Sequence, residues 1–248
     1  MKLAALAKVR DRLVWTVTLF LCLVGATAAA NRAFHVGDAA SRGGPLRTRA
    51  LEAMGIHDAV AADRQRASAT FDARFGAHPG MTRTHVILGG LFLVFAPLQF
   101  YRPLRTRYPS VHRWSGRTLL VLLVLSVIPS IYFGVIAPVA GAWEASIIAL
   151  VAMMVAGGAA RGFWAIRHRR VWLHREWMVR LFALGIGIAS VRLVVLALDL
   201  VTMARQLPFA TIYPLSLWIG WGGTLAAAEL WISITASPRE ESVVPSAA

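Results

Sequence analysis

Six apolar runs constrain what this chain can fold into more than any other feature. They cover about residues 13–30, 84–101, 117–137, 143–166, 177–200 and 211–235. A helix needs about 20 mostly apolar residues to cross a hydrocarbon core of about 30 Å. Only 15% of the 248 residues are charged and 57% are hydrophobic, whereas a soluble domain of this length needs more polar surface. The sequence therefore predicts an all-α fold, a polytopic transmembrane helical bundle with six spans.

The first run has two interpretations. Residues 1–12 are basic and precede the apolar run from Leu13 to Ala30, which ends in the small residues Ala28, Ala29 and Ala30. This order is typical of a cleaved signal peptide, which would leave five spans. We favour a retained anchor, because the other runs already hold the chain in the membrane. Residues 1–30 are thus predicted to be an N-terminal membrane anchor or signal segment.

The only long polar stretch, residues 31–82, is predicted to lie outside the cytoplasm. It contains seven arginines and five acids. Its Ala-rich part, from Leu46 to Phe75, favours one or two amphipathic helices. Residues 83–235 then form a five-helix transmembrane domain, and residues 236–248 form a cytoplasmic tail.

Arginines cluster around alternate connections between the runs. The basic connections contain Arg102, Arg105, Arg107, Arg113 and Arg117, and then Arg161, Arg167, Arg169, Arg170, Arg175 and Arg180. The connections near Pro138 and Pro208 carry almost no positive charge. The positive-inside rule then places both termini in the cytoplasm. The net charge of +14 is explained by topology, so we do not expect a nucleic-acid partner.

Several polar residues lie at the predicted inner face. His112, Arg117, His174 and Arg180 are close to helix starts, and Glu229 lies roughly 9 Å from the middle of the last run toward the same face. A carboxylate at this depth favours an ion pair with Arg180 or Arg117. In an alternative interpretation, His112 and His174 are the axial ligands of a b-type haem. In a third, the arginines bind anionic lipid headgroups.

A second polar group is predicted near the outer face. It contains His85, Arg192, Asp199, Tyr132 and Tyr213. His85 and Gly89 share a helix face that another helix could approach, and Arg192 and Asp199 lie two turns apart on one face. These groups could bind an anionic or quinone-like ligand or take part in proton transfer, or they could form an interhelical hydrogen-bond network.

Signatures of soluble enzymes and metal sites are missing from the sequence. There is no phosphate loop, no dinucleotide fingerprint and no HExxH helix; Gly185 and Gly187 lie within an apolar run and indicate helix packing. The single cysteine, Cys22, excludes an intrachain disulfide and a thiolate metal cluster. We therefore predict no catalytic residue and no metal site, and we favour a non-enzymatic protein.

Four segments carry a family resemblance. They are His85 with Gly89-Gly90, Pro97-Leu98-Gln99-Phe100, His112-Arg113-Trp114-Ser115-Gly116-Arg117, and His174-Arg175-Glu176-Trp177-Met178-Val179-Arg180 continuing to Arg192. In this order they resemble the bacterial predicted membrane protein family called domain of unknown function 2306, over about residues 83–232. Gly223 departs from the pattern, which leads us to expect an asparagine. The resemblance implies a helical membrane domain in the bacterial inner membrane, but no established activity.

The sequence thus predicts a ligand- or lipid-binding helical bundle. Its candidate polar network comprises His85, Gln99, Arg117, Arg180, Arg192, Asp199 and Glu229. The alternative is a haem b-binding electron-transfer protein that uses His112 and His174. A third alternative is a structural subunit that associates with another membrane protein or with itself. In each case the lipid bilayer is a partner, including its anionic lipids.

Overall fold

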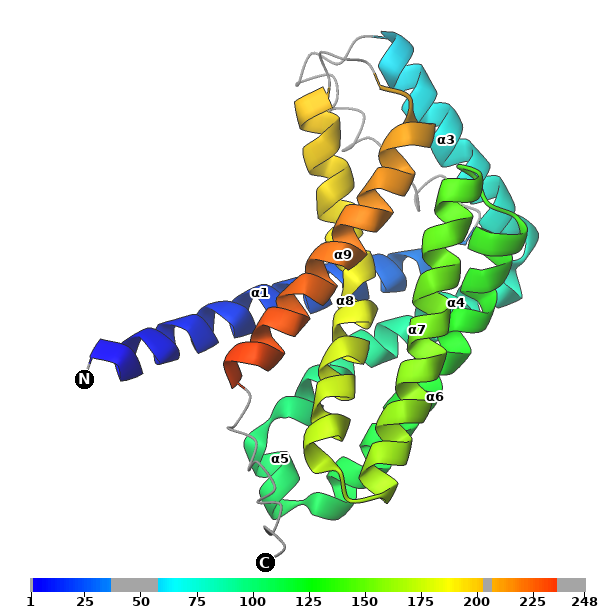
Figure 1. Cartoon of the computed structure of the whole chain (residues 1–248). Helices are drawn as coiled ribbons and strands as arrows, with labels where there is room; N and C mark the ends of the chain where they lie inside the picture. The colour runs from blue at the N-terminus through cyan, green and yellow to red at the C-terminus, as the bar shows by residue number, and fades with distance from the viewer. Residues whose placement is uncertain (1, 37–57, 203–206, 236–248) are drawn as a thin grey trace, which may run out of the picture.

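The computed structural model describes residues 2–36, 58–202 and 207–235, and its regular elements in these ranges are all helical (Figure 1). The helices are α1 (Lys2–Phe34), α3 (Asp58–Ala77), α4 (Pro79–Phe95), α5 (Arg102–Arg107), α6 (Pro109–Ile131), α7 (Ala142–Arg167), α8 (Val171–Thr202) and α9 (Phe209–Thr235). A 3-10 turn over Ala96–Phe100 follows α4, and a π-helical turn over Tyr132–Ile136 follows α6. The predicted tail, 236–248, and residues 46–57 of the predicted amphipathic segment lie outside the described residues.

The prediction of a transmembrane helical bundle is confirmed. In the described ranges, five helices are long and apolar enough to cross a membrane: α1, α4 with its 3-10 turn, α6 with its π turn, α7 and α8. The sixth predicted run forms α9, whose 27 residues extend about 40 Å at 1.5 Å per residue. Helix α9 has the required length but is not among the five.

The helices begin before the apolar runs that predicted them. Helix α6 starts at Pro109 and α8 at Val171, whereas their runs start at residues 117 and 177. The basic turns between helix start and apolar run are helical as well, and a proline occupies the first turn of α4, α5 and α6. Proline suits this position because its missing N–H group has no intrahelical partner there. An apolar run therefore marks the lipid-facing part of a helix rather than its ends.

The bundle has one long axis and two distinct ends (Figure 1). Helices α4, α6, α7 and α8 lie side by side, and α9 packs along α8. Helix α1 packs on α4 and α8, crosses the bundle obliquely, and projects beyond the other helices at its N-terminal turns. The short α5 lies at one end and α3 at the other; we call these the α5 end and the α3 end.

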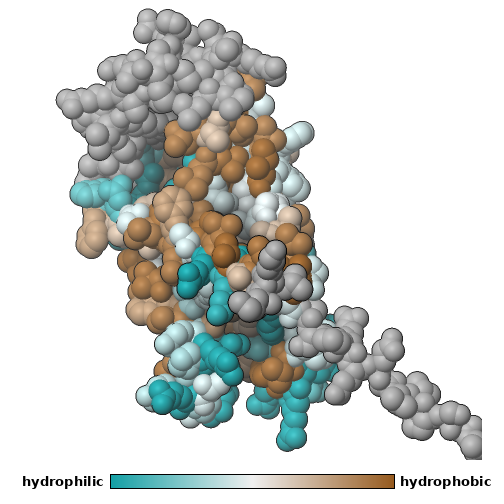
Figure 2. Space-filling model, turned by 90° about the vertical axis from the view of Figure 1, so that its left-hand side faces the viewer, coloured by the Kyte–Doolittle hydropathy of each residue, from teal (hydrophilic) through white to brown (hydrophobic). Residues whose placement is uncertain are grey.

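Apolar side chains cover much of the outer surface. Figure 2 shows hydrophobic residues over the middle of one face, with hydrophilic residues gathered toward its lower end. Large side chains exposed around the bundle include Val121 (54%), Met153 (65%) and Leu196 (53%). In water such a surface would promote aggregation, whereas in a bilayer it contacts lipid tails. The protein is therefore embedded in a membrane.

Two glycines of α8 allow close contacts between helices in the core. A Cβ atom at Gly185 would lie 2.3 Å from Cε1 of Phe92, and one at Gly187 would lie 2.0 Å from Cδ1 of Trp221. Both aromatic rings are buried, and the Trp221 indole Nε1 donates a hydrogen bond to the Leu184 carbonyl oxygen at 3.0 Å. The prediction that Gly185 and Gly187 serve packing is confirmed.

The helix face shared by His85 and Gly89 meets another helix at His85, whose Nδ1 atom lies 2.7 Å from the Ser126 carbonyl oxygen of α6, but not at Gly89. A Cβ atom at Gly89 would have no described neighbour within 4 Å, whereas one at the adjacent Gly90 would lie 3.1 Å from the Ala29 Cβ atom of α1. Helix α1 thus packs against the neighbouring face of α4. Gly89 itself borders a cavity, which is why no helix lies against it.

Candidate functional site

A cavity of about 630 Å³ opens inside the bundle toward its α3 end. Helices α4, α6, α7 and α8 form its walls, and α1, α3 and α9 complete it at the α3 end. Most of its lining is apolar. The polar side chains among the lining residues are Arg32, Arg74, Thr82, His85, Ser126, Ser130, Glu144, Arg192 and Tyr213. The cavity therefore combines an apolar wall with a small set of inward-facing polar groups.

His85 presents one free ring nitrogen at this cavity. Its Nδ1 atom lies 2.7 Å from the Ser126 carbonyl oxygen of α6. A carbonyl oxygen can only accept, so this contact assigns the proton to Nδ1 and leaves Nε2 as an acceptor. This hydrogen bond also holds the His85 imidazole ring of α4 against α6 at the wall of the cavity. The histidine that the sequence placed at the outer site is thus oriented for a ligand hydroxyl or acid group.

Arg192 lines the cavity and keeps accessible surface there. Its Nη1 atom donates to the Ile188 carbonyl oxygen of its own helix at 3.1 Å, and its electrostatic neighbours include Tyr213 and Arg32. Its predicted partner, Asp199, belongs to the part of α8 whose side chains are not described. Among the described side chains, Arg192 has no acidic partner. A charge at this depth needs compensation, because an isolated charge within a bilayer costs roughly 3 kcal/mol or more.

Glu144 is a cavity residue that sequence reasoning missed. It lies in the first turn of α7, is only 2% exposed, and accepts the backbone N–H groups of Val139 and Ala140 at 2.7 and 2.6 Å through Oε2. Gly141, with a φ of 75°, turns the chain back toward this carboxylate in a conformation that favours glycine. The available signal was its position: an acid at the edge of an apolar run marks a functional or structural site.

Helix α3 covers the cavity through aromatic contacts. The Phe71 ring lies 5.0 Å from the Tyr213 ring of α9, and the Phe75 ring lies 4.8 Å from the Phe133 ring that follows α6, both edge to face. Such pairs contribute about 0.5–1.5 kcal/mol each beyond the area that they bury. This packing brings a helix of the polar N-terminal segment onto the transmembrane domain.

Polar contacts anchor the same helix. Asp72 of α3 forms an ion pair with Arg32 of α1, and the Asp63 carboxylate accepts the backbone N–H of Phe209 at 2.8 Å. One further α3 side chain, Arg74, lines the cavity, and its buried Nη1 atom has no hydrogen-bond partner in the described part of the chain. Sequence reasoning missed Arg74 because nothing distinguishes it from the other arginines of residues 31–82.

At the α5 end, Arg180 and Glu229 form a two-bonded ion pair between α8 and α9. Arg180 Nε lies 2.6 Å from Oε1 of Glu229, and Nη2 lies 2.9 Å from Oε2. The Arg180 guanidinium also lies 3.4 Å from Glu176 and over the Trp177 ring at 5.2 Å. The other arginine proposed for Glu229, Arg117, instead lies over the Trp114 ring at 5.2 Å.

Removing one partner of this pair is expected to destabilise the contact between α8 and α9. Arg180→Gln and Glu229→Gln should each lower the thermal unfolding temperature in detergent, while the double variant should lose less than the sum of the two. We expect a coupling free energy of about 1 kcal/mol, because the pair is two-bonded but Glu229 is half exposed. Strictly additive losses would contradict a direct interaction. Arg117→Gln is the matched control and should not couple to Glu229→Gln.

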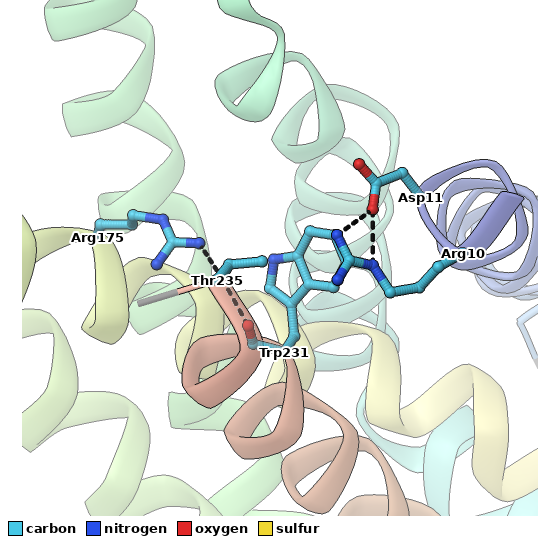
Figure 3. Close-up of polar contacts among 5 residues, drawn as sticks. All are labelled: Arg10, Asp11, Arg175, Trp231 and Thr235. Atoms are coloured by element: carbon cyan, nitrogen blue, oxygen red, sulfur yellow. Dashed lines mark hydrogen bonds and ion pairs between the residues drawn. The ribbon is translucent and has the colours of Figure 1, made fainter. Parts of the chain in front are cut away.

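Further contacts join α1, α8 and α9 at this end (Figure 3). Arg175 donates a hydrogen bond to the Thr235 hydroxyl. Arg10 pairs with Asp11 at 2.7 Å and places its guanidinium 5.3 Å from the Trp231 ring centre. The aromatic ring faces the cation, which is a favourable cation–π arrangement. At the α5 end, arginines of α8 and α1 thus contact α9 from two sides.

The two candidate haem ligands lie away from the cavity lining. His174 Nδ1 is 2.9 Å from the Gly162 carbonyl oxygen, which leaves Nε2 as the free ring nitrogen. His112 is an electrostatic neighbour of His174, and no described residue forms a hydrogen bond with its buried Nδ1 atom. Gln99, also at this end, donates to the Ser115 hydroxyl at 2.8 Å. Among the described residues, no cluster of three or more metal-ligating side chains occurs.

The predicted site residues therefore divide into two places. His85, Arg192 and Tyr213 meet at the cavity, where Arg74 and Glu144 join them. Gln99, Arg117, Arg180 and Glu229 lie toward the α5 end and do not line it. Tyr132, grouped with the outer residues from its predicted depth, lies 2.9 Å from His78 Nε2 through its hydroxyl and does not line the cavity either.

Comparison with known proteins adds one match. A family model described as "Predicted membrane protein (DUF2306)" matches residues 82–232. No curated protein and no solved structure matches the chain.

Proposed function

Because the chain belongs to the DUF2306 family of predicted membrane proteins, we propose that it is a membrane-embedded binding protein whose cavity holds a small amphipathic molecule. The observation that carries this proposal is the cavity of about 630 Å³ with apolar walls and few convergent polar groups. Binding sites for small molecules have volumes of about 300–1,000 Å³ and this kind of lining.

The lining suits a molecule with an apolar tail and a polar head. Apolar residues of four helices surround the inner part of the cavity, among them Phe92, Leu93, Leu123, Val127, Ile148, Val151, Val155 and Leu184. The polar groups of His85, Arg192 and Tyr213 come from α4, α8 and α9. A ligand that fills the cavity thereby contacts three helices at once and stabilises their arrangement.

The proposal includes an orientation in the bacterial inner membrane. The α5 end faces the cytoplasm with both termini, and the cavity faces the opposite side. The clustered arginines around α5 and at the turn before α8 support this orientation, since basic connections are retained inside. The same arginines are suited to anionic lipid headgroups.

Photo-cross-linking tests whether the cavity is a binding site. The protein, reconstituted in lipid nanodiscs, is irradiated with a long-chain alcohol that carries a diazirine in its chain, and labelled residues are mapped by mass spectrometry. We expect labelling of cavity residues on α4, α6 and α7. Gly89→Leu should suppress this labelling several-fold, because Gly89 lines the cavity and a Cβ atom there meets no described neighbour within 4 Å, so the added side chain has room to enter the cavity.

The matched control is Gly222→Leu. A side chain at Gly222 also meets open space, but Gly222 does not line the cavity. This variant should keep the labelling of cavity residues. Labelling that is confined to lipid-facing residues such as Val121 and Met153, in the unmodified protein and both variants alike, would show that the cavity does not take up amphiphiles.

A second candidate function is haem binding between α6 and α8. The observation that favours it is the pair of neighbouring histidines, since His174 donates through Nδ1 to Gly162 and so leaves Nε2 free for a metal. A Soret absorbance band in haem-supplemented protein that disappears in His174→Ala would support this function. A missing band, or one that survives the substitution, would eliminate it.

A further inference from the structure

We infer that the cavity selects an amphipathic acid, whose single anionic group lies between Arg74 and Arg192. This inference rests on the proposed function, because it specifies the head group of the molecule that the cavity would hold. The chemistry shared by candidate ligands is one negative charge, as on a long-chain carboxylate or a phosphate monoester monoanion, attached to an apolar chain.

The charges that line the cavity do not balance. The charged lining residues are Arg32, Arg74, Arg192 and Glu144, with His85 as a titratable neighbour. The ion pair with Asp72 already neutralises Arg32. Two arginines then remain against one carboxylate, so the described lining has one excess positive charge. A ligand with one negative charge restores neutrality in a region where an uncompensated charge is costly.

Arg74 supplies the most specific observation. Its Nη1 atom is buried and has no hydrogen-bond partner among the described residues, although the residue lies near Glu144. Glu144 accepts the Val139 and Ala140 N–H groups through Oε2, and no hydrogen bond joins it to Arg74 in the described structure. A buried donor without an acceptor costs about 1–3 kcal/mol, and more when it is charged. An acid group in the cavity would provide the missing acceptor.

Arg192 faces the same space from α8. It donates through Nη1 to the Ile188 carbonyl oxygen, which lies four residues earlier on the same helix, and its other guanidinium N–H groups have no hydrogen-bond partner among the described residues. Arginine suits an acid group because its planar guanidinium can donate two parallel hydrogen bonds to one carboxylate or phosphate. The two arginines thus approach the α3 end of the cavity from different helices.

An uncharged ligand fits these groups less well. A quinone-like or alcohol head can accept hydrogen bonds from one arginine, but it leaves the excess charge in place. Glu144 also argues against a dianion, since it reduces the positive charge of the lining to one. The apolar walls require that the acid carry a tail, so a short acid such as acetate should bind weakly.

The test compares two photo-cross-linkable probes of equal chain length, a diazirine fatty acid and the corresponding diazirine alcohol. In nanodiscs of zwitterionic lipid, the acid should label cavity residues about tenfold more than the alcohol at equal concentration. Arg74→Gln and Arg192→Gln should each reduce this preference about tenfold while they leave labelling by the alcohol unchanged. A long-chain alkanesulfonate, which carries one negative charge, should compete with the acid, and inorganic phosphate should not.

Arg83→Gln is the matched control, because Arg83 is an exposed arginine on α4 that does not line the cavity. It should retain the acid preference. Equal labelling by acid and alcohol would overturn the inference while the proposed function stands, and no cavity labelling by either probe would overturn both. A preference for the acid that survives Arg74→Gln and Arg192→Gln would show that other groups hold the acid, which also overturns the inference.

Discussion

Gly187→Ala is expected to destabilise the bundle by about 1–3 kcal/mol. The added Cβ atom would lie 2.0 Å from the Trp221 ring, which is only 8% exposed and held by its hydrogen bond to Leu184. The ring cannot move without breaking this bond or the packing between α8 and α9. Thermal unfolding in a single detergent, followed by circular dichroism, should show a lower midpoint than for the unmodified protein.

Gly222→Ala separates this contact from helix propensity. Both substitutions replace a helical glycine, so both gain up to about 1 kcal/mol in helix propensity, but the Cβ atom at Gly222 has no described neighbour within 4 Å. Gly222→Ala should leave the midpoint unchanged or raise it. If Gly187→Ala behaves in the same way, the close contact with Trp221 does not exist. A smaller side chain at position 221, as in Trp221→Leu, should recover part of the loss in the Gly187→Ala background.

Glu144→Ala should reduce the free energy of unfolding by about 2–4 kcal/mol. The buried carboxylate accepts two backbone N–H groups of the turn before α7, and hydrogen bonds to a charged group contribute about 1.5–3 kcal/mol each. Without it, both donors lose their acceptor, and the turn at Gly141 loses the group that holds it. Denaturant or thermal unfolding of the purified protein measures this loss.

Glu144→Gln is the informative comparison. The glutamine side-chain oxygen can still accept a hydrogen bond from the N–H group of Val139 or Ala140. The decrease in the free energy of unfolding should therefore be clearly smaller than in Glu144→Ala. Ser146→Ala, which changes an exposed residue two positions along the same helix, should have almost no effect. Equal losses for Glu144→Ala and Glu144→Gln would mean that the negative charge, rather than the capping of the turn, determines the contribution of this residue.

Long apolar runs predicted the membrane helices well, but not their ends. Burial of apolar surface in lipid depends on composition alone, so it is visible in the sequence. The helix starts at Pro109 and Val171 depend instead on backbone hydrogen bonds that continue through the basic interface. Composition gives no sign of these bonds. The close contact between α8 and α9 at Gly187 could not be predicted, because the sequence shows only a glycine in an apolar run. Its contact residue, Trp221, lies far away in the sequence.

The residues of the cavity were only partly predictable from the sequence, because some of them are brought there only by the packing of distant helices. His85 and Arg192 stand out because polar groups are rare within membrane spans. Arg74 does not, since it is one of seven arginines in residues 31–82, and only the packing of α3 on the transmembrane helices brings it to the cavity. The pairing of Arg180 with Glu229 could be proposed from depth, but the choice of Arg180 over Arg117 depends on how α8 faces α9.

The cavity is assembled from two unequal contributions. The family model begins at residue 82, so His85, Glu144 and Arg192 belong to the matched region, whereas the cover formed by Phe71 and Arg74 precedes it. The walls of the cavity and the α3 helix that covers it thus lie in separate stretches of the sequence. Changes among the first 81 residues can therefore alter the side chains that cover the cavity without altering the walls formed by α4, α6, α7 and α8.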